Sequence, residues 1–199
     1  MTWWCKARAV PLLALAAFGT ILTGLAIGNI ELPIPVLTGQ SGRFLLAHLM
    51  TLIPAVTLLY GLGRADIRST NTAVRHISAW DAALGLLTAG TGMLAAAVCY
   101  LALDSDLAVV LGRNQASYVG LALLLHPLVG TQLAAAALSA IPLVLAAGGW
   151  RPNGTPEPWA WLLHDAGSAL AIAFMTGALV LGAATSITWA RPPLRISGR

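Results

Sequence analysis

Four histidines are the side chains best suited to hold a metal ion or a haem: His48, His76, His126 and His164. His48 lies near one end of an apolar stretch and His126 near the opposite end of another. At a rise of about 1.5 Å per residue the two lie at different depths, so we do not expect them to share a ligand. His164, with Asp165 beside it, can approach His48, which leaves a zinc-like cluster open as an alternative. Because a lone histidine in a membrane bundle more often bonds to a neighbouring helix, we predict no metal site.

The sequence lacks the motifs of the common hydrolytic and nucleotide-binding sites. It has no phosphate-binding glycine loop, no GxSxG and no HExxH, and its two cysteines, Cys5 and Cys99, form no CxxC pair. No Asp, Glu, Lys or Arg falls in the middle of the clearly apolar stretches, whereas ion-coupled carriers usually bury such residues there. We therefore predict that the chain is not an enzyme and has no catalytic residue and no cofactor of its own. Energy for any transport must then come from another chain.

The composition places nearly all of the chain in a membrane. Of its 199 residues, 58% are hydrophobic and 9% are charged, whereas about a quarter are charged in soluble domains. A membrane-spanning helix needs about 20 apolar residues. The sequence therefore predicts an all-α fold, an integral membrane bundle of six transmembrane helices in a single domain with both termini cytoplasmic. The predicted spans are residues 9–29, 43–63, 82–103, 107–129, 133–149 and 160–190.

The fourth predicted span is the least regular, because the polar run 113–115 interrupts it. Three alternatives stay open: a thin or tilted span, a helix from Leu107 whose Arg113 reaches out to the membrane surface, and a re-entrant segment. The basic residues favour six full spans, since eight of the eleven then face the cytoplasm. Those eight are Lys6, Arg8, Arg64, Arg68, Arg75, Arg191, Arg195 and Arg199, and the three outside are Arg43, Arg113 and Arg151.

Prolines and small residues predict local features of the spans. Pro54 lies within the second span and predicts a kink there. Gly85, Ala89 and Gly92 have the spacing of a small-residue face, so the third span is expected to pack closely against another helix. Residues 31–42 contain two prolines and two glycines and predict an extended, turn-rich connection on the outer side.

The longest polar stretch is residues 64–81, which carries three arginines. At about 100° per residue, residues 69–80 separate an apolar arc containing Ile77 and Trp80 from a polar arc, which predicts a short amphipathic helix. We predict that a cytoplasmic partner docks on this helix. A solvated loop that only joins two spans stays open as the alternative. The predicted docking residues are Arg68, Thr72, Arg75, His76 and Ser78.

This layout resembles the ABC-2-type permeases, the membrane halves of ABC exporters, which have six spans, both ends inside and a short cytoplasmic helix after the second span. In that resemblance, residues 69–80 correspond to the coupling helix on which an ATPase subunit docks, and residues 150–165 to the outer elbow before the last span. It implies an ATP-binding subunit that carries ATP and Mg, a second permease half that is identical or related, and a hydrophobic or peptide-like substrate. The chain departs from the family pattern in residues 1–8, which are short for the usual interfacial helix, and in its small outer elbow.

Two other functions stay open. The small-residue faces favour a non-catalytic subunit that assembles a larger membrane complex, and His48, His126 and His164 are the basis for a haem or quinone redox subunit. In each case we expect an oligomeric, multi-pass protein of a bacterial cytoplasmic (inner) membrane. We expect it to contact the lipid bilayer and not to bind nucleic acid. The bacterial source is inferred from ten arginines against one lysine and from abundant Ala, Gly and Leu, which are typical of a high-GC genome.

Overall fold

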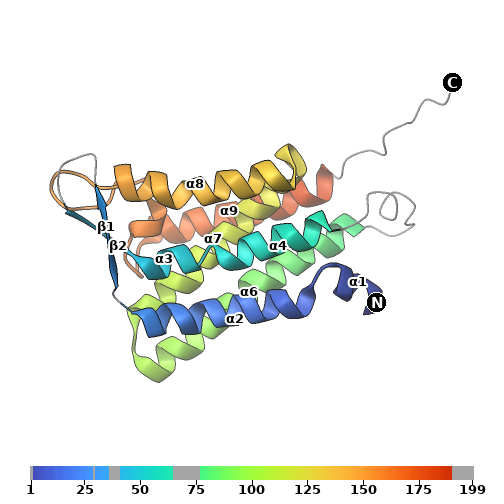
Figure 1. Cartoon of the computed structure of the whole chain (residues 1–199), viewed down its shortest axis with the longest axis horizontal. Helices are drawn as coiled ribbons and strands as arrows, with labels where there is room; N and C mark the ends of the chain where they lie inside the picture. The colour runs from blue at the N-terminus through green and yellow to red at the C-terminus, as the bar shows by residue number, and fades with distance from the viewer. Residues whose placement is uncertain (1, 29, 36–40, 65–76, 190–199) are drawn as a thin grey trace.

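The chain folds into a bundle of long helices with one small hairpin (Figure 1). The computed structural model describes residues 2–28, 30–35, 41–64 and 77–189. The helices are α1 (Thr2–Ala7), α2 (Val10–Ile27), α3 (Leu46–Met50), α4 (Ile53–Gly63), α6 (Ile77–Leu103), α7 (Asp106–Val129), α8 (Thr131–Gly148), the 3-10 helix η1 (Trp161–Leu163) and α9 (Ala169–Thr188). Strands β1 (Glu31–Pro35) and β2 (Ser41–Leu45) pair antiparallel.

Among the described residues, six segments are long and apolar enough to cross a membrane. They are α2, α3 with α4, α6, α7, α8 and α9. This confirms the predicted all-α bundle of six transmembrane helices and indicates a multi-pass membrane protein. The helix α7 runs unbroken over 24 residues. The polar run that made this segment ambiguous therefore lies inside a full-length helix.

The two ends of the bundle hold different structures (Figure 1). At one end, the α1 end, lie α1, the last turn of α4, the first turn of α6 and the last turn of α9. At the other, the hairpin end, lie β1, β2 and the connection from α8 to α9, residues 149–168. Because the number of candidate spans is even, the start of the first span, α2, and the end of the last, α9, lie on the same side of a membrane.

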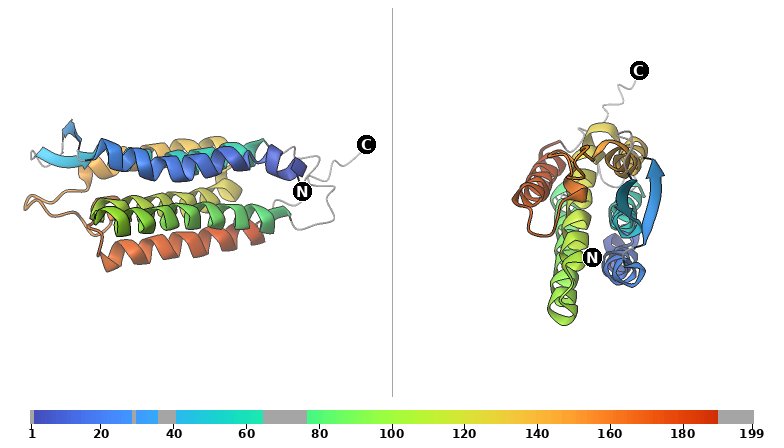
Figure 2. Two further views of the ribbon diagram at one scale, coloured as in Figure 1. Left: turned by 90° about the horizontal axis from the view of Figure 1, so that it is seen from below. Right: turned by 90° about the vertical axis from the view of Figure 1, so that its left-hand side faces the viewer.

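The helices form two layers (Figure 2). One layer contains α2, α3, α4 and α8, and the other contains α6, α7 and α9. The central helix α7 contacts helices of both layers and packs most extensively on α6 and α9. In the most apolar 18 residues of α7, 72% of the residues are buried, against at most 50% in the corresponding part of any other span. The core of the bundle therefore follows α7.

Small residues allow the close approach of α6 to α7. A Cβ added at Gly85 would come within 2.6 Å of the Leu123 side chain, and one added at Gly92 would collide with the Gln115 amide. Both partners belong to α7. The predicted close packing of the third span against another helix is therefore confirmed, and the neighbouring helix belongs to this chain.

The helix limits differ from the predicted spans at three places. The second span begins at Leu46 because residues 41–45 pair in β2, and its break falls between α3 and α4. Pro54 is in the first turn of α4, where its missing N–H removes no helical hydrogen bond, so it begins a helix instead of kinking one. The third span begins five residues early, at Ile77. The last begins at Ala169, where the Ser168 hydroxyl accepts a bond from the Ala171 N–H and caps the helix.

Candidate functional site

At the α1 end, one buried arginine joins three parts of the chain. Arg8, between α1 and α2, is only 3% exposed. Its Nη2 lies 2.6 Å from the Asp81 Oδ2, and its Nη1 donates to the carbonyls of Leu62 at 3.0 Å and Gly61 at 3.5 Å. We call these four residues the Arg8 clasp. It fastens the N-terminal segment to the end of α4 and to the start of α6.

Local backbone features position the Arg8 clasp. Ala9 has a φ of 51°, so the chain turns sharply between α1 and α2 and directs Arg8 back to the bundle. Gly61 is required on the facing side, because a Cβ there would come within 2.5 Å of the Arg8 carbonyl oxygen. The rings of Trp4 and Trp80 meet edge to face, with their centroids 6.1 Å apart. The start of α6 is thus held against α1 by an ion pair and an aromatic contact.

The clasp flanks the segment in which a partner was predicted to dock. Four of the predicted docking residues, Arg68, Thr72, Arg75 and His76, lie outside the described residues, as does most of the predicted helix over residues 69–80. Ser78 is half-buried in the first turn of α6. Sequence reasoning used Arg8 only as a sign of membrane orientation and missed its contact with Asp81. The usable signal was that each residue directly precedes an apolar stretch and that the two carry opposite charges.

The middle of α7 is a run of buried polar side chains. Arg113, Asn114, Gln115, Ser117 and Tyr118 are each at most 1% exposed. Arg113 was predicted to lie outside or to reach the membrane surface; its side chain is covered by protein and directed to the α8–α9 connection at the hairpin end. The prediction of no charged residue in the middle of the clearly apolar stretches did not cover this segment, whose arginine finds partners inside the protein.

Those partners are carbonyl groups of the α8–α9 connection. Arg113 donates from Nη1 to the carbonyl of Asp165 at 2.6 Å and from Nη2 to that of His164 at 2.6 Å. Asn114 donates from Nδ2 to the carbonyl of Leu162 at 3.1 Å, and its Oδ1 accepts from the Arg113 Nε and Nη2 at 3.3 Å. Arginine has five N–H donors and no acceptor, which suits a cluster of carbonyls in non-helical backbone. The connection is therefore fixed to the central helix.

Aromatic rings extend this attachment toward α9. The rings of Tyr118 and Trp161 meet edge to face at 5.2 Å between centroids, and Trp161 stacks on Phe174 of α9 at 4.8 Å. The short helix η1 is thus held between α7 and α9. Sequence reasoning missed the whole attachment, because the acceptors are backbone carbonyls that no side-chain pattern reveals.

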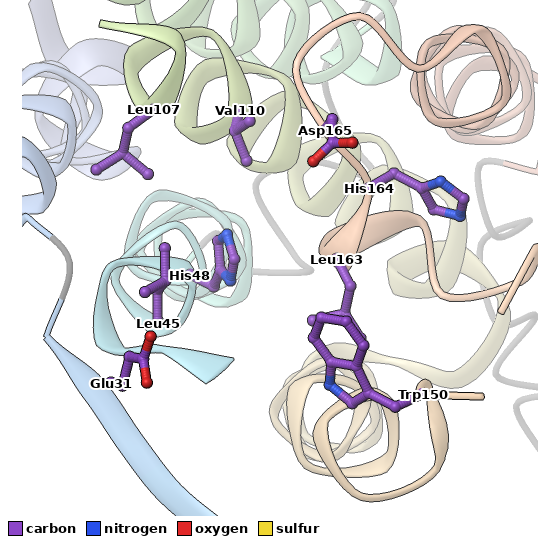
Figure 3. Close-up of a pocket in the computed structure, with 9 residues that line it drawn as sticks. All are labelled: Glu31, Leu45, His48, Leu107, Val110, Trp150, Leu163, His164 and Asp165. Atoms are coloured by element: carbon purple, nitrogen blue, oxygen red, sulfur yellow. The ribbon is translucent and has the colours of Figure 1, made fainter. Parts of the chain in front are cut away.

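A pocket of about 400 Å³ lies at the hairpin end, between the two layers (Figure 3). It contains two of the histidines considered as ligands, His48 and His164, with Asp165 beside them. The remaining lining residues are Glu31, Leu45, Leu107, Val110, Trp150 and Leu163. The hairpin, α3, the start of α7 and the α8–α9 connection all contribute to its wall.

The two histidines line the same pocket, but their side chains are directed to different parts of it. The His164 ring points away from His48 (Figure 3), and its nitrogens lie 3.1 Å from the Glu157 carbonyl oxygen and 3.4 Å from the Ser168 hydroxyl. Within the described part of the chain, no three His, Cys, Asp or Glu side chains are grouped closely enough to hold a metal ion. His126 lies in the last turn of α7, far along the helix from the pocket.

No protein-family model, curated protein or solved structure matches this chain. Its function must therefore be inferred from its own contacts. These comprise a clasp at the α1 end, a pocket at the hairpin end and a buried polar run on α7 between them.

Proposed function

We propose that this chain is the membrane permease subunit of an ATP-driven exporter in a bacterial cytoplasmic membrane. A separate ATP-binding chain, which carries ATP and Mg, docks on residues 64–81 and supplies the energy. A second permease half, identical or related, completes the assembly, and the substrate is hydrophobic or peptide-like. The observation on which the proposal depends is the Arg8 clasp.

The clasp favours a mechanical role for the predicted docking segment over a passive connection. A buried ion pair resists separation, because removing one partner leaves the other charge unpaired away from water. Arg8 and Asp81 are such a pair. Asp81 is the last residue of this segment, and Arg8 joins it to the end of α4, where the segment begins. A displacement of the segment therefore pulls on α2, α4 and α6 at once. The helix α1 is six residues long, which remains short for the interfacial helix typical of the ABC-2-type permeases.

The two alternative functions gain less from the described contacts. Gly85 and Gly92 had favoured an assembly subunit, but they pack against α7 of the same chain. The redox alternative depended on three histidines. His48 and His164 line the pocket at the hairpin end, whereas His126 lies in the last turn of α7, so the three are not gathered in one place.

The proposal is tested by purifying the chain from its host in mild detergent and measuring the ATPase activity of the chains that come with it. We expect a nucleotide-binding chain to co-purify and to be lost in the R75E and R68E variants. The matched control is R151Q, because Arg151 is an exposed arginine at the hairpin end, paired with Glu157 at 3.1 Å. If no nucleotide-binding chain co-purifies with the unmodified protein, or if R151Q loses it equally, the proposal is wrong.

A further inference from the structure

Two polar side chains in the middle of α7 are buried without a hydrogen-bond partner. Gln115 and Tyr118 are both 0% exposed. Among the described residues, neither the amide nitrogen nor the amide oxygen of Gln115 has a partner, and neither does the Tyr118 hydroxyl. Ser117, between them, differs because its hydroxyl donates to the Arg113 carbonyl at 2.9 Å. The unpaired groups are thus two specific side chains and not the whole polar run.

Their depth makes these unpaired groups costly. Gln115 is the tenth residue of α7, so it lies about 14 Å along a helix that crosses roughly 30 Å of hydrocarbon. Near the centre of a membrane no water is at hand to satisfy an amide or a hydroxyl. Leucine at position 115 and phenylalanine at position 118 would fill similar space without this cost. The two polar groups are therefore expected to have partners in another state of the protein.

Both residues lie on the part of α7 that continues from the pocket. Gln115 and Tyr118 are three residues apart, which places them on neighbouring parts of one helix face. Leu107, in the pocket wall, precedes Tyr118 by eleven residues, which is about three turns and about 16.5 Å along the axis, so the two lie on the same side of α7. Gly92 leaves the space that the Gln115 amide occupies. Gln115 thus faces α6, and Tyr118 faces η1 through Trp161, so a movement of α7 against α6 and η1 that begins at the pocket would reach these groups.

We propose that Gln115 and Tyr118 form a central binding site for an uncharged hydrogen-bonding group, such as a peptide amide, carried by a mostly apolar molecule. The Gln115 amide offers two donors and an acceptor, and the Tyr118 hydroxyl offers one donor and an acceptor, which matches the N–H and C=O of an amide. The pocket at the hairpin end is the mouth of this site. That the bound molecule is cargo depends on the proposed function, whereas the existence of the site does not.

The first test is the accessibility of the site to a water-soluble thiol reagent. In a C5S/C99A background reconstituted in liposomes, we expect Q115C and Y118C to react with the uncharged, water-soluble reagent 2-hydroxyethyl methanethiosulfonate at least tenfold faster than A116C. Ala116 is the matched control, because it is equally buried and lies about 100° further round the helix. N-acetyl-trileucine amide should slow the labelling of Q115C. Equal rates at positions 115 and 116 would overturn the proposal.

The second test is thermal stability in detergent, and it separates a binding role from a structural one. Because Q115L and Y118F remove unpaired groups, each should raise the unfolding midpoint by roughly 3 °C. The control S117A should not raise it, since the Ser117 hydroxyl is already bonded. N-acetyl-trileucine amide should raise the midpoint of the unmodified protein and leave that of Q115L unchanged. A lower midpoint in both Q115L and Y118F would show that the two groups are satisfied within the fold, and the proposal would be wrong.

Neither test needs a partner chain. If no ATPase co-purifies but labelling and stabilisation behave as expected, the site stands and the exporter proposal fails. If an ATPase co-purifies but positions 115 and 116 label alike, the exporter proposal stands and the central site fails.

Discussion

Replacing Arg8 by methionine removes the charge of the Arg8 clasp while it keeps most of the side-chain volume. The variant leaves the Asp81 carboxylate without the arginine 2.6 Å away and frees the carbonyls of Gly61 and Leu62. Breaking a buried ion pair by removing one partner costs about 3–5 kcal/mol. Because the Asp81 side chain is 15% exposed, we expect the lower end, about 3 kcal/mol. For a chain of this size, that is a fall of roughly 6–12 °C in the unfolding midpoint.

The assay is a double-mutant cycle on thermal unfolding in detergent, with R8M, D81L and R8M/D81L. The double variant should be more stable than R8M, because no unpaired carboxylate remains in it. K6M is the control, since Lys6 is exposed and its loss should change the free energy of unfolding by less than about 0.5 kcal/mol. If R8M unfolds at the same temperature as K6M, or if the double variant is no more stable than R8M, the clasp does not hold the helices as argued.

Three further perturbations test other contacts. G92L should lower the free energy of unfolding by roughly 1–3 kcal/mol, because the new side chain collides with Gln115. The control G90L should have little effect, since a Cβ at Gly90 meets open space. Chemical unfolding measures both variants. R113K should release the α8–α9 connection, because lysine lacks the fork that reaches the carbonyls of His164 and Asp165; limited proteolysis should then cut residues 149–168 several-fold faster, and equal cutting would contradict the assigned attachment. Trileucine amide with a free, charged N-terminus should protect Q115C from labelling roughly fifteenfold less well than its acetylated form does. The cause is repulsion between that charge and Arg113 at a separation on the order of 10 Å. Equal protection by the two forms would argue against a neutral site.

Apolar length and small-residue spacing were sufficient to predict the six spans and the tight face of α6. Both properties act through the chain's own helices, since apolar runs must cross the membrane as helices and Gly85 and Gly92 leave space for a neighbour. The fourth span was ambiguous because hydropathy treats Arg113 as an obstacle to burial. In the folded protein its charge is surrounded by carbonyl oxygens, so the obstacle disappears once the connection is in place.

Two of the remaining misses share a physical cause, which is that backbone from a distant part of the chain supplies hydrogen-bond partners. The start of the last span moved to Ala169 because the preceding residues are bonded to Arg113 and Asn114 instead of to their own helix. The Arg8 clasp likewise depends on carbonyls more than 50 residues away. A helix-by-helix interpretation of the sequence cannot predict such contacts, because the carbonyl of every residue is an equally good acceptor.

The two buried arginines differ in a way that bears on what can pass along α7. Arg8 faces a carboxylate at 2.6 Å, so its charge is neutralised where it lies. The hydrogen bonds of Arg113 go to carbonyl and amide oxygens, and among the described ion pairs none involves it. The carbonyl dipoles of the α8–α9 connection stabilise the guanidinium toward the hairpin end of α7, close to the pocket that Asp165 also lines. A cationic group moving from the pocket toward Gln115 would meet that charge at low dielectric, where repulsion is several times stronger than in water. An amide would not, because it carries no net charge. The arginine that fixes the α8–α9 connection therefore opposes the passage of a cation toward Gln115, which agrees with the assignment of the central site to a neutral hydrogen-bonding group.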